Sequence, residues 1–320
     1  MKVEIKGDEY QYFDNIVELS DIRNNFIELI NETFGFDFTE WYNEGYWTKK
    51  YEPHVLIRDN KVVATVTVNY MKYIYDNKEK IYIQIGGVLT REEYSNKGLS
   101  TWLMEQIIHQ YQNSCDQMFL LCDDSAISFY PRLGFIKAIE YIAKYQWKGI
   151  KEEKIANLEQ LFVAKKLDVK ILEDRNILLK CYEKSNPISV FTSIECEELL
   201  LFYGMGFRKN CVYYFSEIKT VVIAKFEKAV LVIEDIYGEY DCETQCAQND
   251  FMKLIIKTIL EMNKRETEAC LVEFGFTPSD ELTELSVEEL VKKDDTLYIL
   301  DGKENLFDQY QLRFPILSHN

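Results

Sequence analysis

Histidine is scarce in this sequence of 320 residues, and the familiar glycine loops for nucleotides are missing. His54, His109 and His319 are its only histidines, and they stand far apart. Cys242 and Cys246 are four residues apart, but no histidine lies near them, so we expect no metal site. The sequence contains neither a Walker loop nor a dinucleotide-binding glycine triplet. These absences exclude the commonest metal and nucleotide motifs.

Basic side chains are also in deficit. The chain has 37 Lys and Arg against 54 Asp and Glu, which gives a formal net charge of −17. Binding to a phosphate backbone requires clustered Lys and Arg, so this balance argues against a nucleic-acid partner. An acidic surface favours cationic small molecules or peptides, although such a charge more often serves only solubility.

Long apolar runs are absent as well. No window is apolar enough to span a bilayer, and the opening "MKVEIKGDEYQYF" lacks an apolar signal core. The eight cysteines are scattered, and four of them lie in apolar runs: Cys115, Cys122, Cys211 and Cys270. Buried free thiols in a reducing compartment explain this pattern best. We therefore expect a cytoplasmic protein without a membrane partner.

The first half of the chain alternates strand and helix signals. The length slightly exceeds what one core usually serves, which favours two domains. Apolar spacing from Asp21 predicts a helix capped by Ser20 or Asp21, and a turn at Asp59-Asn60 joins two strands. The elements expected next are a strand over 80–90 interrupted by Gly86-Gly87, a helix over 97–112, a strand over 117–122, a short helix capped by Asp124 and closed by Gly134, and a strand over 135–147.

The second half repeats this pattern in outline. A charged, helical stretch follows Trp147, and we place the linker near Gly149. Residues 211–238 predict three strands, residues 249–264 a helix capped by Asn249 or Asp250, and residues 269–276 a short buried strand. The expected fold is α/β, with a mixed and mostly antiparallel sheet flanked by helices in domain 1–148 and a degenerate copy in domain 149–320.

The corner between the strand over 80–90 and the helix that follows it carries the strongest chemical signal. The stretch "EEYSNKGLSTWL" begins a helix with Lys97 and Gly98 and has no acidic cap on the first turn. A helix N-terminus exposes unpaired N–H groups and partial positive charge, and a glycine lets an anion approach the backbone. The corner is therefore a candidate pyrophosphate site, although a glycine at a helix start is more often only a turn residue.

Two stretches resemble the GNAT (GCN5-related) N-acetyltransferases. Residues 86–100, "GGVLTREEYSNKGLS", resemble the acetyl-coenzyme A motif of that family, with Gly98 and Ser100 in the glycine positions of its loop. Ser95 departs from the usual Arg or Gln, and Glu92 from a frequent proline. Residues 125–135, "SAISFYPRLGF", resemble the second signature, with Tyr130 in register. The whole chain looks like the tandem acetyltransferases of the enhanced-intracellular-survival (Eis) type.

The resemblance implies a set of cofactor-binding residues. Val88 and Thr90 would lie on the strand that pairs with the pantetheine arm. The pyrophosphate would rest on the main-chain N–H groups of Lys97, Gly98, Leu99 and Ser100. The N–H near Gly87-Val88 could polarise the thioester oxygen. Because acetyl-CoA is polyanionic, Lys97, Arg91 and Arg132 are candidate sources of local positive charge, although ordinary solvated side chains explain the two arginines as well.

Tyr130 is the candidate general acid. A phenol stays protonated at neutral pH and can give its proton to a departing thiolate. The general base is open, and its candidates are carboxylates: Glu32, Asp37, Glu40, Glu44, Asp123, Asp124 and the terminal carboxylate of Asn320. In Eis-type relatives the terminal carboxylate enters the active site, and the apolar tail "LRFPILSHN" is expected to be docked.

The aromatic residues of the acidic segment before the sheet would line the acceptor groove by the same resemblance: Trp41, Tyr42, Tyr46 and Trp47. Such a groove suits a cationic amine, while plain hydrophobic packing explains the same residues equally well. The sequence thus predicts an acetyl-CoA-dependent N-acetyltransferase that acts on an amine of a small molecule or peptide. The alternatives are a non-catalytic CoA-binding sensor or interaction module, and an acyltransferase for cell-wall peptides. The oligomeric state is open, a homo-oligomer included.

Overall fold

The strands of the protein form two sheets. The computed structural model describes residues 1–36, 38–148, 163–239, 248–265, 270–291 and 295–318. The first sheet has the order β1 (Lys2–Ile5), β2 (Asp8–Phe13), β3 (Tyr51–Arg58), β4 (Lys61–Tyr75), β5 (Lys78–Thr90), β6 (Gln117–Cys122), β16 (Thr296–Leu300) and β7 (Phe135–Lys137), with β10 (Phe191–Ile194) pairing along β4. The second has the order β15 (Ser286–Glu289), β8 (Tyr141–Gln146), β14 (Leu271–Phe274), β13 (Val230–Gly238), β12 (Thr220–Glu227), β11 (Val212–Phe215) and β9 (Ala164–Lys166).

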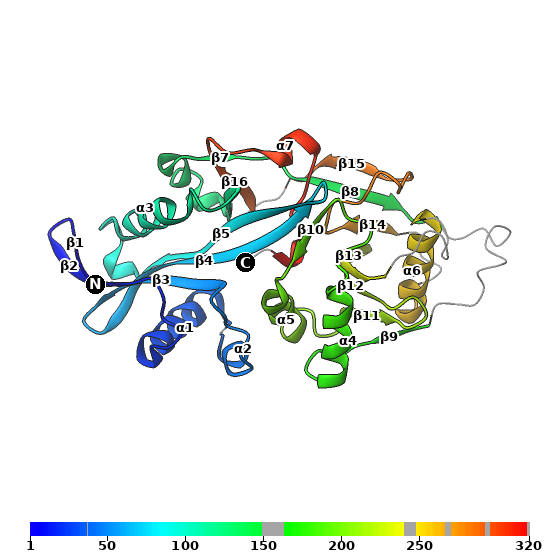
Figure 1. The fold of residues 1–320 in the computed structure, drawn as a ribbon, viewed down its shortest axis with the longest axis horizontal. Coiled ribbons are helices and arrows are strands. Elements are labelled where there is room, and N and C mark those ends of the chain that lie inside the picture. The colour runs from blue at the N-terminus through cyan, green and yellow to red at the C-terminus, as the bar shows by residue number, and fades with distance from the viewer. Residues whose placement is uncertain (37, 149–162, 240–247, 266–269, 292–294, 319–320) are drawn as a thin grey trace.

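Helices cover both faces of the first sheet, as Figure 1 shows. On one face lie α1 (Ser20–Phe34) and α2 (Thr39–Asn43), and on the other lies α3 (Leu99–Tyr111). The second half adds α4 (Leu172–Tyr182), α5 (Glu197–Met205), α6 (Gln248–Met262) and α7 (Leu306–Tyr310). Neighbouring strands are antiparallel except for β5 with β6 and β13 with β14. The predicted α/β class with a mixed, mostly antiparallel sheet is confirmed.

Each sheet contains at least one strand from the other half of the chain, and besides β16 the first sheet includes β10, which pairs with β4. The early strand β8 pairs with β14 and β15 in the second sheet, and the late strand β16 lies between β6 and β7 in the first. The prediction of one strand over 135–147 is therefore wrong. Ala138 N still bonds to Leu297 O of β16 (3.0 Å), and the chain leaves the first sheet at Ile139, whose N–H bonds to Asp308 Oδ1 instead (2.6 Å).

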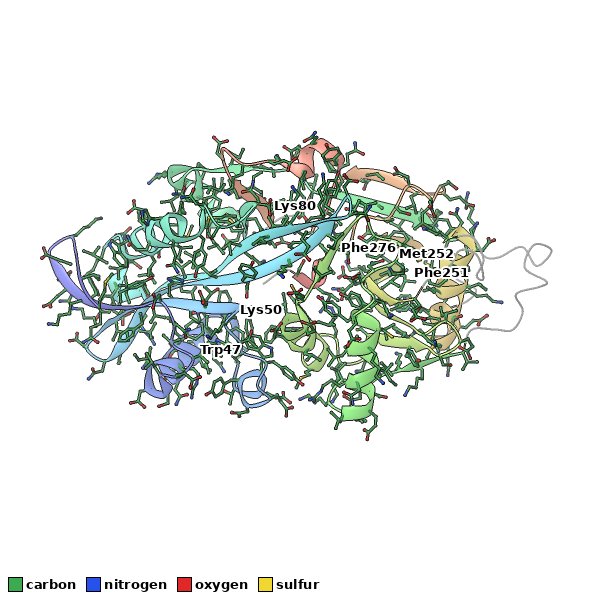
Figure 2. All side chains as sticks on the ribbon, in the orientation of Figure 1. Trp47, Lys50, Lys80, Phe251, Met252 and Phe276 are labelled. Carbon is green, nitrogen blue, oxygen red and sulfur yellow. The ribbon has the colours of Figure 1, made fainter. Side chains whose placement is uncertain are left out.

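The second sheet repeats the central connection of the first. α6 joins β13 to the parallel strand β14, as α3 joins β5 to β6. Phe251 and Met252 of α6 are buried with Phe276 in the core of this half (Figure 2). The predicted repeat is present in this topology. The predicted caps of α6 are wrong, because the helix already includes Gln248 and so holds Asn249 and Asp250 in its first turn.

Other local predictions are corrected by the backbone. α1 begins after Leu19 without a side-chain cap, so Ser20 and Asp21 lie inside the helix. The expected short helix after β6 is two 3₁₀ turns, Asp124–Ala126 and Tyr130–Leu133, and its cap is Asp123, not Asp124. Pro131 fits near the start of the second turn, because an N–H group at that position would have no partner within the turn. The linker near Gly149 and the helix expected after it lie outside the described residues.

The C-terminal tail is buried between the two sheets. The ring of Phe314 stacks on Phe119 with centroids 3.9 Å apart and also packs against Phe307. Leu312 and Phe314 are almost fully buried, so the predicted docking of the tail is confirmed as far as Ser318. The six cysteines within the described ranges are free thiols, whereas Cys242 and Cys246 fall outside those ranges. No helix in the described segments is long and apolar enough to cross a membrane.

Candidate functional site

The pairing of β5 with β6 stops before β5 ends. Their register runs from Tyr82↔Gln117 to Ile85↔Leu120, yet β5 continues to Thr90. Beyond Ile85 the edge of β5 that faced β6 has no ladder partner among the described strands. Residues 86–90 are all partly exposed. A stretch of strand backbone is therefore open to hydrogen bonding at this point.

A bulge on the other side of β5 starts at the same place. The register with β4 passes from Thr67↔Gly86 to Thr65↔Leu89, which confirms the bulge predicted from the two glycines. Gly87 has φ +50°, and a Cβ added there would lie 3.0 Å from Thr67 Cγ2. A side chain at Gly87 would therefore meet both backbone strain and crowding, which explains the glycine.

Gly98 begins α3 in a left-handed conformation. Its φ is +81°, and as a glycine it has no side chain with which to cap the helix. The first helical hydrogen bond runs from Trp102 N to Gly98 O (3.0 Å), so the N–H groups before Trp102 have no partner within the helix. Thr90 Oγ1 and Ser100 Oγ lie 2.7 Å apart and join the end of β5 to this first turn. The predicted cofactor residues Thr90, Gly98 and Ser100 thus meet at one corner.

Positive charge gathers at this corner of an acidic protein. A Cβ added at Gly98 would lie 3.0 Å from Lys6 Cε and 3.2 Å from its Nζ, so the Lys6 side chain lies directly over the glycine. Lys97 Nζ is 3.3 Å from Asp8 Oδ2, and Arg58 Nη1 is 2.9 Å from Asp8 Oδ1. The hydrogen bonds from Arg58 and then Lys97 lower the pKa of Asp8. Two cations therefore flank the Asp8 carboxylate, and Lys6 adds a third positive charge beside the helix start.

Lys6 and Arg58 were not found from the sequence. Both are lone basic residues far from the glycine motif, and only the β1–β2 hairpin brings Lys6 to Gly98. Of the other predicted cations, Arg91 already has hydrogen-bond partners. It donates from Nη1 to Glu32 Oε2 (3.0 Å) and from Nε to Val62 O (2.9 Å). Arg132 is exposed on the turn that follows Tyr130.

Tyr130 lies in the core beside the end of β6. It is 7% exposed, and its ring neighbours include Phe129, Phe135 and Tyr298 of the exchanged strand β16. Burial, reinforced by nearby Cys122, raises the pKa of the Tyr130 phenol above its ordinary value. Burial also raises the pKa of the Cys122 thiol, to about 11. Tyr130 is therefore a protonated phenol at neutral pH.

A pocket lies between the N-terminal half and α5. Its wall includes Phe38, Trp41 and Tyr51 from the first half and Glu198 and Phe202 from the second. Of the four aromatic residues predicted for an acceptor groove, only Trp41 lines this pocket. The others are used in packing: Tyr42 lies under Arg23, Tyr46 accepts from Arg175, and Trp47 donates to Tyr51 O.

The predicted carboxylates mostly have structural partners. Glu32 pairs with Arg91, Glu40 with Lys170, Glu44 with Arg175, and Asp123 accepts from Ser125 N. Asp124 begins the 3₁₀ turn that Asp123 caps. Asp37 and Asn320 lie outside the described residues. Ser318, two residues before the end of the chain, is buried.

Two buried amides beside Gly86 were also missed by sequence reasoning. Asn69 Nδ2 donates to Gln84 Oε1 (3.3 Å), and Gln84 Nε2 has no hydrogen-bond partner in the described part of the chain. Gln84 is fully buried and precedes Gly86 by two residues on β5. An unsatisfied buried donor costs free energy, which a bound oxygen atom would recover. Nothing in the strand pattern distinguishes this glutamine from a solvated one.

Comparison with known proteins agrees with this geometry. Residues 20–135 match the acetyltransferase (GNAT) family. No curated protein matches the chain in sequence. Among solved structures, a probable N-acyltransferase of unknown function from Enterococcus faecalis superposes with TM-score 0.56 at 13% identity, covering 93% of this chain and 72% of that one.

Two further structures share the fold over most of the chain. Eis1 from Mycobacterium abscessus has TM-score 0.52 at 11% identity, covering 92% of this chain and 74% of its own. A GCN5-related N-acetyltransferase from Anabaena variabilis has TM-score 0.53 at 12% identity, covering 91% and 72%. At these identities the likeness establishes the fold alone. Residues 20–135 match the acetyltransferase (GNAT) family, and the fold over most of the chain is similar to that of Eis1.

Proposed function

We propose that the protein is an acetyl-CoA-dependent N-acetyltransferase that acts on an amine of a small molecule or peptide. The observation that carries the proposal is the end of β5–β6 pairing at Ile85, directly before the Gly86-Gly87 bulge and the Gly98 corner. Open strand edge and open helix N–H groups lie on one connected segment there. A thioester with a pantetheine arm and a pyrophosphate needs both kinds of donor in that order.

The residues at the corner fit acetyl-CoA. Gly98, Leu99 and Ser100 would present their N–H groups to the pyrophosphate, because the N-cap Gly98 has no side chain to cap them. Lys97 and Lys6 would supply positive charge. Val88 and Thr90, which follow the bulge, would pair with the pantetheine arm along the free edge of β5.

The chemistry asks little more of the protein. The amine nitrogen, after loss of one ammonium proton, attacks the thioester carbonyl carbon. The C–S bond breaks, the thiolate takes a proton from its donor, and the nitrogen loses its second proton, which restores that donor. Tyr130 is the proposed proton donor to the thiolate because its phenol is buried and protonated. The proposed acceptor of the ammonium proton is the terminal carboxylate of Asn320, because the tail is buried up to Ser318 and Glu32, Glu40, Glu44 and Asp123 have structural partners.

The two halves of the chain would have different roles. We propose residues 1–148 as the catalytic domain and residues 149–320 as a degenerate GNAT-like domain. The exchange of β8 and β16 ties each domain to the sheet of the other. Such an exchange predicts that the two domains unfold together.

The test is a panel of amines with a free-thiol readout and acetyl-CoA as donor. We expect thiol release with at least one amine, and we expect Tyr130→Phe to lower kcat about 100-fold while leaving the Kd for acetyl-CoA unchanged. The matched control is Tyr298→Phe, a neighbouring buried tyrosine, which should retain activity. Tight acetyl-CoA binding without thiol release across the panel would instead support a CoA-binding sensor.

A further inference from the structure

The pocket between the halves has an aromatic wall and a narrow interior. The rings of Phe38, Trp41 and Phe202 lie 5.5 to 5.8 Å apart across it, with Tyr51 5.2 Å from Phe38. The space open to the centre of a water-sized molecule is about 30 Å³, within about 450 Å³ of non-atom space that includes open solvent. Such a pocket admits a slender arm rather than a bulky group.

Aromatic rings continue from this pocket to the surface. Phe36 lies 5.9 Å from Phe202 and 5.7 Å from Phe207, and Phe34 stacks on Phe36 at 5.9 Å. Phe34 and Phe207 are 50% and 52% exposed, which is unusual for phenylalanine. Exposed aromatic side chains beside a pocket commonly belong to a ligand-binding surface. Here Phe34 and Phe207 form an exposed surface that an apolar or aromatic group of a ligand could contact outside the pocket.

The charges at the pocket leave an excess of negative charge. Lys50 Nζ, labelled in Figure 2, contacts Glu198 Oε2 (3.2 Å), Glu197 Oε2 (3.8 Å) and Glu195 O (2.5 Å). One ammonium therefore faces two carboxylates of α5. Glu198 also accepts from Thr48 Oγ1 at 3.1 Å, which leaves acceptor capacity on both of its oxygens. A second ammonium can be accommodated.

The pocket also adjoins the proposed acetyl position. Asn69, which lines the pocket, stands opposite Gln84 in the β4–β5 register, and Thr67 stands opposite Gly86. Asn69 is therefore two residues, about 7 Å, along β4 from the start of the bulge. The unpartnered Nε2 of Gln84 lies in this interval and can donate to an oxygen of the bound acyl group or acceptor.

We propose that this pocket is the acceptor site and that it selects an ammonium on a short arm attached to an aromatic or apolar body, in preference to a polyamine. Glu198 and Phe202 of the second half recognise the acceptor, so neither half alone forms the complete site. This inference rests on the proposed transferase function. It assigns the otherwise unexplained second half a role in substrate specificity.

The test compares 2-phenylethylamine with spermidine in the full-length protein. We expect a KM for 2-phenylethylamine at least about tenfold below that for spermidine, and an increase of about tenfold in Glu198→Gln with the KM for acetyl-CoA unchanged. The matched control is Glu195→Gln, because that carboxylate pairs with Lys72 at 2.8 Å and is not part of the pocket wall, so KM should change less than about twofold. Phe202→Leu should raise KM for 2-phenylethylamine more than for ethylamine.

Direct binding separates this inference from the function on which it rests. Calorimetry with 2-phenylethylamine should detect binding that weakens in Glu198→Gln, whether or not turnover occurs. Binding without thiol release would refute the transferase function and retain the pocket assignment. Thiol release with spermidine but not with 2-phenylethylamine, or a KM that is the same in Glu198→Gln and the wild type, would overturn the inference and leave the transferase function intact.

Discussion

Thr90 Oγ1 lies 2.7 Å from Ser100 Oγ, so one hydroxyl pair joins the last residue of β5 to the first turn of α3. The strand that would hold pantetheine and the helix that would hold pyrophosphate are thereby fixed relative to each other. Neither residue is fully exposed, and a hydrogen bond of this kind typically contributes about 1 kcal/mol.

This pair gives the first prediction. Thr90→Val and Ser100→Ala should each weaken acetyl-CoA binding about threefold to tenfold, because each loosens the corner by one hydrogen bond. Calorimetric Kd values for both single variants and the double variant form a thermodynamic cycle. We expect the double variant to resemble the singles, since both remove one shared interaction. Fully additive losses would mean that the two hydroxyls act independently.

Gly98 gives the second prediction. Gly98→Ala places a Cβ in a left-handed conformation and within 3.0 Å of Lys6 Cε, so it should weaken acetyl-CoA binding by at least about tenfold. Gly35 is the matched control, because it has φ +75° at the end of α1 and open space around its missing Cβ. Gly35→Ala should lower the free energy of unfolding by about 1 kcal/mol and leave the Kd unchanged. Equal Kd values for the two variants would contradict a cofactor role for Gly98.

The Gly86-Gly87 bulge and the Gly98 turn were predictable because glycine reports the local backbone directly. The exchange of β8 and β16 was not, since an alternating pattern indicates a strand but not its partner. The β1–β2 hairpin was missed although Lys6-Gly7, both at positive φ, carries the signal of a tight turn.

The residues of the candidate site differ in the same way in how far the sequence predicts them. Gly98 belongs to a motif that sequence alone reveals. Lys6, Gln84 and Glu198 become significant only through contacts with residues far away in the chain, and each alone is an ordinary polar side chain. Only the tertiary structure brings these three residues to the candidate site.

Lys6 gives the third prediction. Its ammonium lies over Gly98, so Lys6→Ala should weaken acetyl-CoA binding about twofold to fivefold at low salt, with the difference shrinking as salt rises. Lys2, on the same hairpin but paired with Glu9, is the control, and Lys2→Ala should leave the Kd unchanged. Calorimetry at two ionic strengths measures both. A loss independent of salt would point to a structural role for Lys6.

His54 gives the fourth prediction, on stability. The side chain is fully buried, bonds through Nδ1 to Tyr12 OH at 2.7 Å, and leaves Nε2 without a partner among the described residues. Burial lowers the pKa of His54 from 6.5 to about 4. The unfolded chain therefore binds the extra proton first, and the free energy of unfolding should fall by about 3 kcal/mol as the pH drops from 6.5 to 4.

Urea unfolding across this pH range tests the assignment. His54→Gln, which cannot titrate, should remove most of this slope, whereas His109→Gln, which replaces an exposed histidine on α3, should retain it. If both variants keep the wild-type slope, His54 is not the group responsible.

Asp235 gives the fifth prediction, with the opposite sign. Its carboxylate is buried and accepts from Asn186 Nδ2 (2.7 Å), Tyr237 OH (2.8 Å) and Ile236 N (2.9 Å). Burial nevertheless raises its pKa from 3.8 to about 6. The folded state holds the proton longer, so its stabilising contribution is complete below pH 4 and decreases by about 3 kcal/mol as the pH rises through 6.

The two groups should oppose each other between pH 4 and 6 and flatten the wild-type profile there. Asp235→Asn keeps the acceptor for Asn186 and Ile236 but cannot ionise, so it should expose the steeper rise with pH that His54 alone would cause. Its stability relative to the wild type should therefore improve from pH 4 to pH 7 in urea unfolding. A constant difference across that range would mean that Asp235 ionises as readily in the folded protein as in the unfolded chain, despite its burial beside Tyr237.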